Sequence, residues 1–178
     1  MNTFSKENDD PSLKNLYGKE AVTKMRNMID GAGSTCFFRT DISNHTSHTA
    51  RPMSVQKTDE EGNLWFLSAM DSNKNIELFE SPSASLFFQD SDHMGFMELQ
   101  GRVIITKDKD KIDELWGPVV KNWFKSKDDP RITVIQFIPE SGYYWDEKHG
   151  NTIAGIKLLL GAITGKNMDD AVEGKLAI

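Results

Sequence analysis

The sequence predicts a mainly β fold: an antiparallel β-barrel with helices at its ends and sides. Strand-forming runs occur in pairs around polar turns, as in residues 82–89 and 96–106 on either side of the turn at 90–95. Helical stretches do not alternate regularly with these strands, and no glycine-rich phosphate fingerprint of the G-x-G-x-x-G or Walker type is present. This pattern argues against a Rossmann sheet.

The length of 178 residues suits one domain with a hydrophobic core of its own. Residues 1–10 are polar and without periodicity, which predicts a flexible N-terminal arm. We expect the domain to span residues 11–165, and residues 166–178, which are mostly polar, to form a C-terminal tail.

The first predicted element is a helix that begins at Asp10 and Pro11, an N-cap residue followed by proline at the first helical position. Gly31 and Gly33 mark its end. Its apolar residues keep to one helical face, which should pack on a sheet: Leu13, Leu16, Val22, Met25, Met28 and Ile29.

Three strands are predicted next. Residues 34–40 form the first, and residues 49–57 and 63–69 form a hairpin around an acidic turn. Pro52 removes one backbone donor from the second strand, so we expect that strand at a sheet edge or beside a bulge. The third strand is apolar on both faces, as in a closed barrel or under a helix.

A short helix should follow at residues 73–80, with Asp71 or Ser72 as its N-cap. Lys74 then lies in the first helical turn, where the helix dipole disfavours a cation unless an anion is bound nearby.

Two interpretations of Lys74 follow. In the first, it binds a phosphate monoester together with Ser68, Ser72 and the free N–H groups of the helix start, with Arg51 in reach. In the second, Asp71 caps the helix and Lys74 extends into solvent.

The remaining elements follow the same logic. Gly101 indicates a bulge, and Gln100 beside it is a candidate to face a ligand. Residues 108–116 and 119–124 predict two short helices, and residues 132–138 predict a strand that residues 143–145 extend or follow. Residues 153–163 have the length of a helix but contain glycines.

Composition excludes several function classes. The net charge of -6, without a basic run, argues against nucleic-acid binding. No apolar stretch approaches the length of a membrane span, and no secretory signal opens the chain. The lone Cys36 suggests a buried thiol in a reducing compartment. We therefore expect a soluble cytoplasmic protein. The four histidines lack the spacing of a metal site, and no nucleophile–base constellation supports hydrolysis.

Several motifs occur in a fixed order: R-P-M at 51–53, G-x-L-W-F at 62–66, S-x-K at 72–74, and L-W and W-F at 115–116 and 123–124. Together they resemble the pyridoxamine 5'-phosphate oxidase-like family of flavin-binding split barrels, and within it the general stress protein 26 family. The resemblance implies an antiparallel split β-barrel that binds FMN or FAD and forms a homodimer with flavin at the subunit interface.

The resemblance and the residues together give a set of candidate cofactor-binding positions, with no catalytic residue and no metal ligand assigned. They are Arg51, Pro52, Met53, Gln56, Phe66, Leu67, Ser68, Ser72, Lys74, Gln100, Trp116 and Trp123.

The chain departs from the true oxidase at three places. Gln56 and Asn73 stand where that enzyme has a lysine and an arginine, and no arginine follows Arg131 to bind a vitamin B6 phosphate. We therefore expect a flavin-dependent oxidoreductase of unknown substrate, and no oxidation of pyridoxamine phosphate.

Two alternatives stay open. One is a non-enzymatic protein that stores flavin or senses it in the stress response. The other is a barrel that binds haem, with an axial ligand among the four histidines: His45, His48, His93 and His149.

Overall fold

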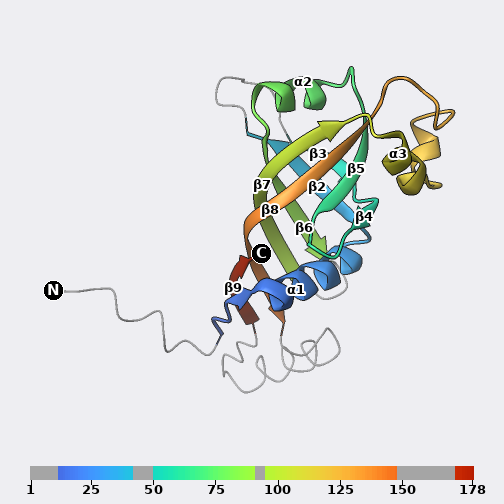
Figure 1. Ribbon diagram of the computed structural model, residues 1–178. Helices are drawn as coiled ribbons and strands as arrows, with labels where there is room; N and C mark the ends of the chain where they lie inside the picture. Colours follow the sequence, from blue (N-terminus) through green and yellow to red (C-terminus); the bar gives the residue numbers. More distant parts are fainter. Residues whose placement is uncertain (1–11, 42–49, 91–94, 148–170) are drawn as a thin grey trace.

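The computed structural model describes residues 12–41, 50–90, 95–147 and 171–178. Their elements are, in chain order, β1 (Leu16–Tyr17), α1 (Gly18–Gly31), β2 (Thr35–Thr40), β3 (Ala50–Ser54), β4 (Lys57–Thr58), β5 (Leu64–Ala69), α2 (Asn73–Glu80), β6 (Ser83–Asp90), β7 (Gly95–Thr106), α3 (Lys109–Leu115), the 3₁₀ turn η1 (Val120–Asn122), β8 (Ile132–Glu147) and β9 (Ala171–Ala177). The strands form one mixed sheet that curls into a barrel, with α1 and α2 at opposite ends and α3 at the side (Figure 1). The predicted fold class is confirmed.

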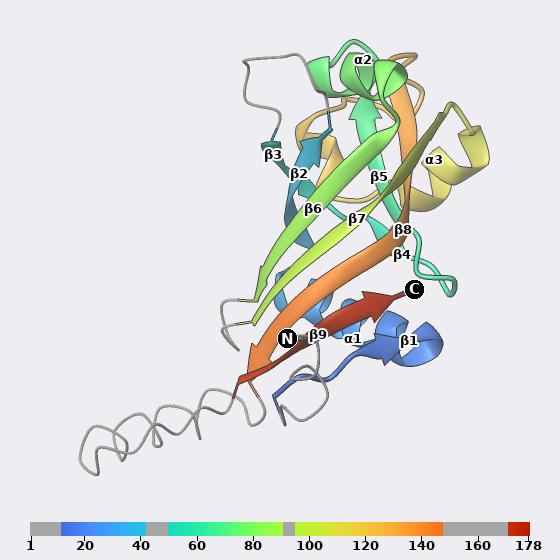
Figure 2. The same cartoon turned by 90° about the vertical axis from the view of Figure 1, so that its left-hand side faces the viewer.

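The long strand β8 explains why the barrel is split. β7 pairs antiparallel with most of one edge of β8. The other edge is divided, because residues 132–137 pair with β5 whereas residues 142–147 pair with β9 (Figure 2). The sheet therefore branches at β8, and the main path continues from β7 through β6 and β2 to β3.

Strand β5 lies between two hydrophobic cores. Leu64 and Phe66 are fully buried in the main core inside the barrel, where Phe66 meets Phe38 edge to face with ring centroids 5.5 Å apart. Trp65 and Leu67 point the other way, toward a smaller second core. That second core contains Ile112, Leu115, Val120, Phe124, Ile132 and Val134. This arrangement explains why the strand is apolar on both faces.

Several local predictions are confirmed. β3, which contains Pro52, lies at the end of the strand order. The pairing of β7 with β8 shifts register between Gln100 and Gly101, where a Cβ atom would lie 2.2 Å from the carbonyl oxygen of Ile138. Asp108 caps α3 by accepting a hydrogen bond from the backbone N–H of Lys111. Residues 143–145 extend the last strand, since β8 is continuous.

The start of the first helix was predicted wrongly. α1 begins at Gly18 and not at Asp10, and Leu16 and Tyr17 pair in parallel with Leu176 and Ala177 of β9. The apolar spacing before Gly18 therefore serves a strand pairing with a segment distant in sequence. Ala21, Met25, Met28 and Ile29 do form the buried face of α1.

The predicted hairpin was also wrong in part. β3 pairs with β2, and of the predicted strand at residues 49–57 only Lys57, in β4, pairs with β5, where it lies opposite Trp65. The backbone leaves the strand pattern at Val55 and Gln56, which separates the two pairings. The second predicted helix at residues 119–124 is only the 3₁₀ turn η1.

The structure tests only some of the remaining predictions. Cys36 is buried, as expected, and no helix in the described ranges is long and apolar enough to cross a membrane. The four histidines and residues 153–163 lie outside the described residues. The division into arm, domain and tail stays a prediction, although residues 171–177 of the tail form β9, which pairs with β8 within the sheet.

Candidate functional site

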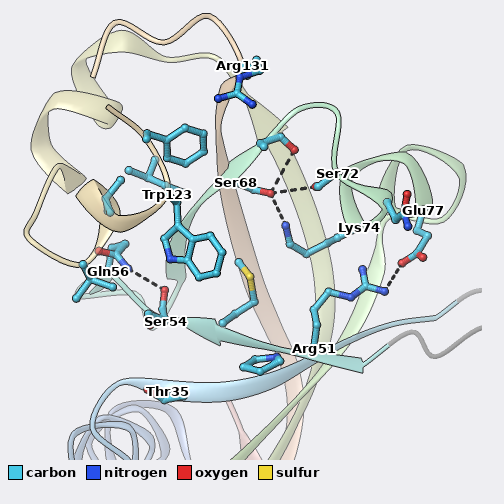
Figure 3. Close-up of a pocket in the computed structure, with 18 residues that line it drawn as sticks. Thr35, Arg51, Ser54, Gln56, Ser68, Ser72, Lys74, Glu77, Trp123 and Arg131 are labelled. Atoms are coloured by element: carbon cyan, nitrogen blue, oxygen red, sulfur yellow. Dashed lines mark hydrogen bonds and ion pairs between the residues drawn. The ribbon is translucent and has the colours of Figure 1, made fainter. Parts of the chain in front are cut away.

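A cavity of about 710 Å³ opens between β3, β5, the start of α2 and the segment around η1 (Figure 3). Most of the predicted binding residues line it: Arg51, Pro52, Met53, Gln56, Leu67, Ser68, Ser72, Lys74 and Trp123. The R-P-M, S-x-K and W-F motifs, which are separate in sequence, therefore lie around one cavity.

Three predicted residues do not line this cavity. Phe66 is fully buried in the main core, because the alternation of β5 turns it away from Leu67. Gln100 is exposed on β7, where it donates a hydrogen bond to Glu98 at 3.0 Å. Trp116 packs against the second core.

Other lining residues were not predicted. Glu77 lies one helical turn after Lys74, so helical spacing alone would have placed it beside that lysine. Arg131 also lines the cavity and pairs with Asp129 at 2.8 Å. The remaining additions are Thr35, Ser54, Ala69, Asn73, Val119, Val120 and Phe124, of which the last three were predicted only as helix residues.

Lys74 is buried at the start of α2, with only 5% of its surface exposed. Its ammonium donates a hydrogen bond to the hydroxyl of Ser68. Ser72 is the N-cap and accepts a hydrogen bond from the backbone N–H of Asn75 at 3.3 Å. The interpretation in which Asp71 caps the helix and Lys74 extends into solvent is therefore wrong.

Burial, together with the nearby charge of Arg51, lowers the pKa of Lys74 to about 8, while Glu77 acts in the opposite direction. The ammonium form is thus held in a place where it lacks both water and a direct carboxylate partner of its own among the described residues. An anion bound in the cavity would compensate for this desolvation.

Arg51 contributes a second cation from β3. Its Nη2 atom pairs with a carboxylate oxygen of Glu77 at 2.7 Å, and the same oxygen accepts a hydrogen bond from Thr40 at 2.6 Å. Within the described part of the chain, the buried Nη1 atom of Arg51 has no hydrogen-bond partner. A buried donor without a partner costs free energy, so this atom is a candidate ligand contact.

Buried hydrogen bonds tie the start of α2 to the sheet. The amide of Asn75 donates to the hydroxyl of Thr133 at 2.8 Å, and that hydroxyl donates to the carbonyl oxygen of Ser68 at 3.0 Å. Asn75 and Thr133 are both almost fully buried. The donors around the cavity are therefore fixed in place before any ligand arrives.

The other walls of the cavity are apolar and aromatic. Pro52, Met53 and Leu67 form one side, and the segment around η1 forms the other. The indole of Trp123, which is 78% exposed, lies over the cavity opposite Arg51 and Lys74 (Figure 3). This arrangement suits a planar ring with an anionic substituent.

Among the described residues, no group of three or more His, Cys, Asp or Glu side chains could hold a metal ion. Ser68 and Ser72 contact each other at 3.3 Å between their hydroxyl oxygens. The arrangement can bind an anion and a ring.

Comparison with known proteins gives a family match over most of the chain. The model of the pyridoxamine 5'-phosphate oxidase-like family matches residues 20–169. A search of curated proteins found no match.

Solved structures share the fold. A protein assigned to general stress protein 26 from Jannaschia sp. CCS1 has 19% identity and a TM-score of 0.70, and the match covers 88% of this chain and 99% of that one. General stress protein 26 from Bacillus anthracis str. Sterne has 20% identity and a TM-score of 0.59, covering 69% and 92%. The general stress FMN/FAD binding protein from Xanthomonas citri has 21% identity and a TM-score of 0.61, covering 72% and 89%. At these identities the likeness establishes the split-barrel fold alone.

Proposed function

Because the chain belongs to the pyridoxamine 5'-phosphate oxidase-like family, we propose that it binds a flavin nucleotide, FMN or FAD, in the cavity beside α2, as a general stress protein. The structural neighbour from Xanthomonas citri is described as FMN/FAD binding, which supports the choice of cofactor. The observation that carries the proposal is a pair of cations beside the cavity, the buried Lys74 at the start of α2 and the half-buried Arg51 of β3.

Lys74 and Arg51 fit a flavin phosphate. Lys74 as a residue is 5% exposed, and the Nη1 atom of Arg51 has no hydrogen-bond partner in the described ranges. Ser72 and the free N–H groups of α2 add neutral donors at the same place. These groups would hold the phosphate, while Met53, Leu67 and Trp123 would enclose the ring.

When bound, the flavin supplies the redox chemistry, while the protein supplies binding, orientation and exclusion of water. In this chain the apolar walls exclude water from the ring, and the fixed donors on α2 orient the phosphate. We propose an oxidoreductase of unknown substrate that works as a cytoplasmic homodimer, with flavin at the subunit interface. Gln100 and Trp116, which lie outside this cavity, are then candidates for contact with the flavin of the partner.

The visible spectrum of the freshly purified protein tests the proposal. We expect a yellow protein with flavin absorption bands, or a colourless protein that acquires these bands when FMN is added. A protein that does neither would overturn the proposal. A red protein with a Soret band would show that the ligand is haem and not flavin.

Turnover separates the enzyme from a storage or sensing protein. An oxidoreductase should consume NADH or NADPH steadily when an electron acceptor is present. A protein that binds flavin tightly but reaches no steady consumption with a panel of acceptors would favour storage or sensing.

A further inference from the structure

The proposed phosphate site contains a carboxylate beside its cations. Glu77 lines the cavity one turn of α2 after Lys74 and pairs with Arg51. Gln56 and Asn73, two further lining residues, are neutral, and Arg131 is already paired with Asp129. Among the described residues that line the cavity, Lys74 and Arg51 are therefore two cations beside one anion, Glu77, in addition to the paired Arg131.

Glu77 is held in place and does not move freely. The same oxygen of its carboxylate accepts from Arg51 at 2.7 Å and from Thr40 at 2.6 Å. Its side chain is only 15% exposed, so water screens its charge weakly. Any phosphate that reaches the Nη1 atom of Arg51 would share that guanidinium with Glu77.

We propose that Glu77 is a charge-selectivity residue, which makes the site favour a singly charged phosphoryl group, such as the riboflavin-side phosphoryl of the diphosphate in a flavin dinucleotide, over a doubly charged phosphate monoester. This inference rests on the proposed function, since it concerns the flavin phosphate in the same cavity.

The reason is electrostatic. Two cations and one carboxylate leave one unit of positive charge, which a phosphodiester neutralises. A phosphate monoester carries about 1.5 to 2 negative charges at pH 7, so its second charge meets the Glu77 carboxylate, and the described lining residues offer it no further unpaired cation. At the effective dielectric of a partly buried site and separations of several Å, such repulsion weakens binding by about tenfold.

The test compares three ligands that share one ring: riboflavin, FMN and the methyl ester of FMN, whose phosphate carries one charge. Each is titrated by flavin fluorescence into the apoprotein at pH 7.5 and low salt. Glu77→Gln keeps the size of the side chain and removes its charge. Glu80→Gln, a change at an exposed position of the same helix, is the control for net charge.

The wild type should bind the methyl ester at least as tightly as FMN. Glu77→Gln should raise the affinity for FMN about tenfold, raise that for the methyl ester by a smaller factor, and leave riboflavin unchanged. Glu80→Gln should change all three affinities by less than about twofold, because exposed charges are screened.

A wild type that prefers FMN over its methyl ester by tenfold would overturn the inference, and this comparison needs no variant. A Glu77→Gln protein with equal or weaker FMN affinity would also overturn it. In both cases flavin binding itself survives, whereas failure of all three ligands to bind the wild type would overturn the proposed function as well.

Discussion

Replacing Lys74 by alanine should weaken FMN binding and leave riboflavin binding nearly unchanged. Lys74 is 5% exposed, so little solvent screening reduces its interaction with a phosphate. A charge-assisted hydrogen bond of this kind contributes ~1.5–3 kcal/mol, which corresponds to a loss of about ten-fold to more than one hundred-fold in FMN affinity. Riboflavin lacks the phosphate and should lose less than about twofold.

The same substitution should have the opposite effect on the stability of the ligand-free protein. Burial lowers the pKa of Lys74 from 10.5 to about 8, and each pKa unit corresponds to about 1.36 kcal/mol. Removing the ammonium relieves a desolvation penalty on the order of 3 kcal/mol. The loss of packing by the aliphatic part of the side chain acts in the opposite direction. We therefore expect the apoprotein melting temperature to stay the same or rise.

Isothermal titration with FMN and riboflavin, together with thermal unfolding of the apoprotein, measures both effects. Ser72→Ala is the matched comparison, because it removes a neutral donor at the same site and should lose ~0.5–1.5 kcal/mol of FMN affinity. Equal losses for FMN and riboflavin in Lys74→Ala, or a strongly lowered melting temperature, would refute the assignment of Lys74 as a phosphate ligand.

Four further predictions follow from the fold and the site. FMN affinity should fall as the pH rises above about 8, because Lys74 loses its proton there. The contribution of Lys74 to apoprotein stability should instead rise between pH 8 and 10.5, because the unfolded chain binds more protons than the folded chain in that range. Both trends should be absent in Lys74→Ala. Phe66→Ala should lower the free energy of unfolding by ~3–5 kcal/mol in urea titrations and leave the ratio of FMN to riboflavin affinity unchanged, since Phe66 lies in the main core; a changed ratio would place it in the site. Sedimentation should give a homodimer, and a flavin-loaded species of 20.1 kDa at micromolar concentration would contradict it. Pyridoxamine phosphate under air should yield no significant pyridoxal phosphate, because no arginine follows Arg131; multiple turnovers would disprove this.

Local sequence patterns predicted the elements that local physics determines. α2, which begins after Ser72, has the predicted bounds, because a capping serine and an apolar stripe are both short-range features. The bulge at Gly101 was predictable, since no side chain fits there against the carbonyl of Ile138. In α2 the interactions that fix the helix lie within the helix itself, and at the bulge the presence of a glycine is enough to indicate the irregularity.

Pairings between distant segments were beyond local patterns. Leu16 faces a partner at Leu176, and the spacing of apolar residues before Gly18 fits a helix equally well. The strand containing Pro52 pairs with Phe37 and not with β5, a choice that depends on the closure of the whole barrel. The sequence of one strand does not indicate which distant strand it will pair with.

The site was predicted better on its polar side than on its apolar side. Ser72 and Lys74 occur in a short motif whose chemistry is visible in sequence. The lining by Val119 and Phe124 depends on how the segment after α3 folds back over β5, and that packing is tertiary. The partner of Arg51, Glu77, was missed although helical spacing indicated it.

The separation of the two cores implies that the part of the protein around the second core can unfold while the main core stays folded. The second core joins α3 and η1 to β5 and β8 through a small set of side chains, and its buried residues are distinct from those of the main core. Amide hydrogens of residues 109–124 should therefore exchange with solvent through sub-global opening, at a lower free energy than those of β6 and β7. Because Val120 and Phe124 also line the cavity, opening of this unit would admit a bulky ring without disturbing the barrel, and a bound ring should slow exchange in this unit more than elsewhere.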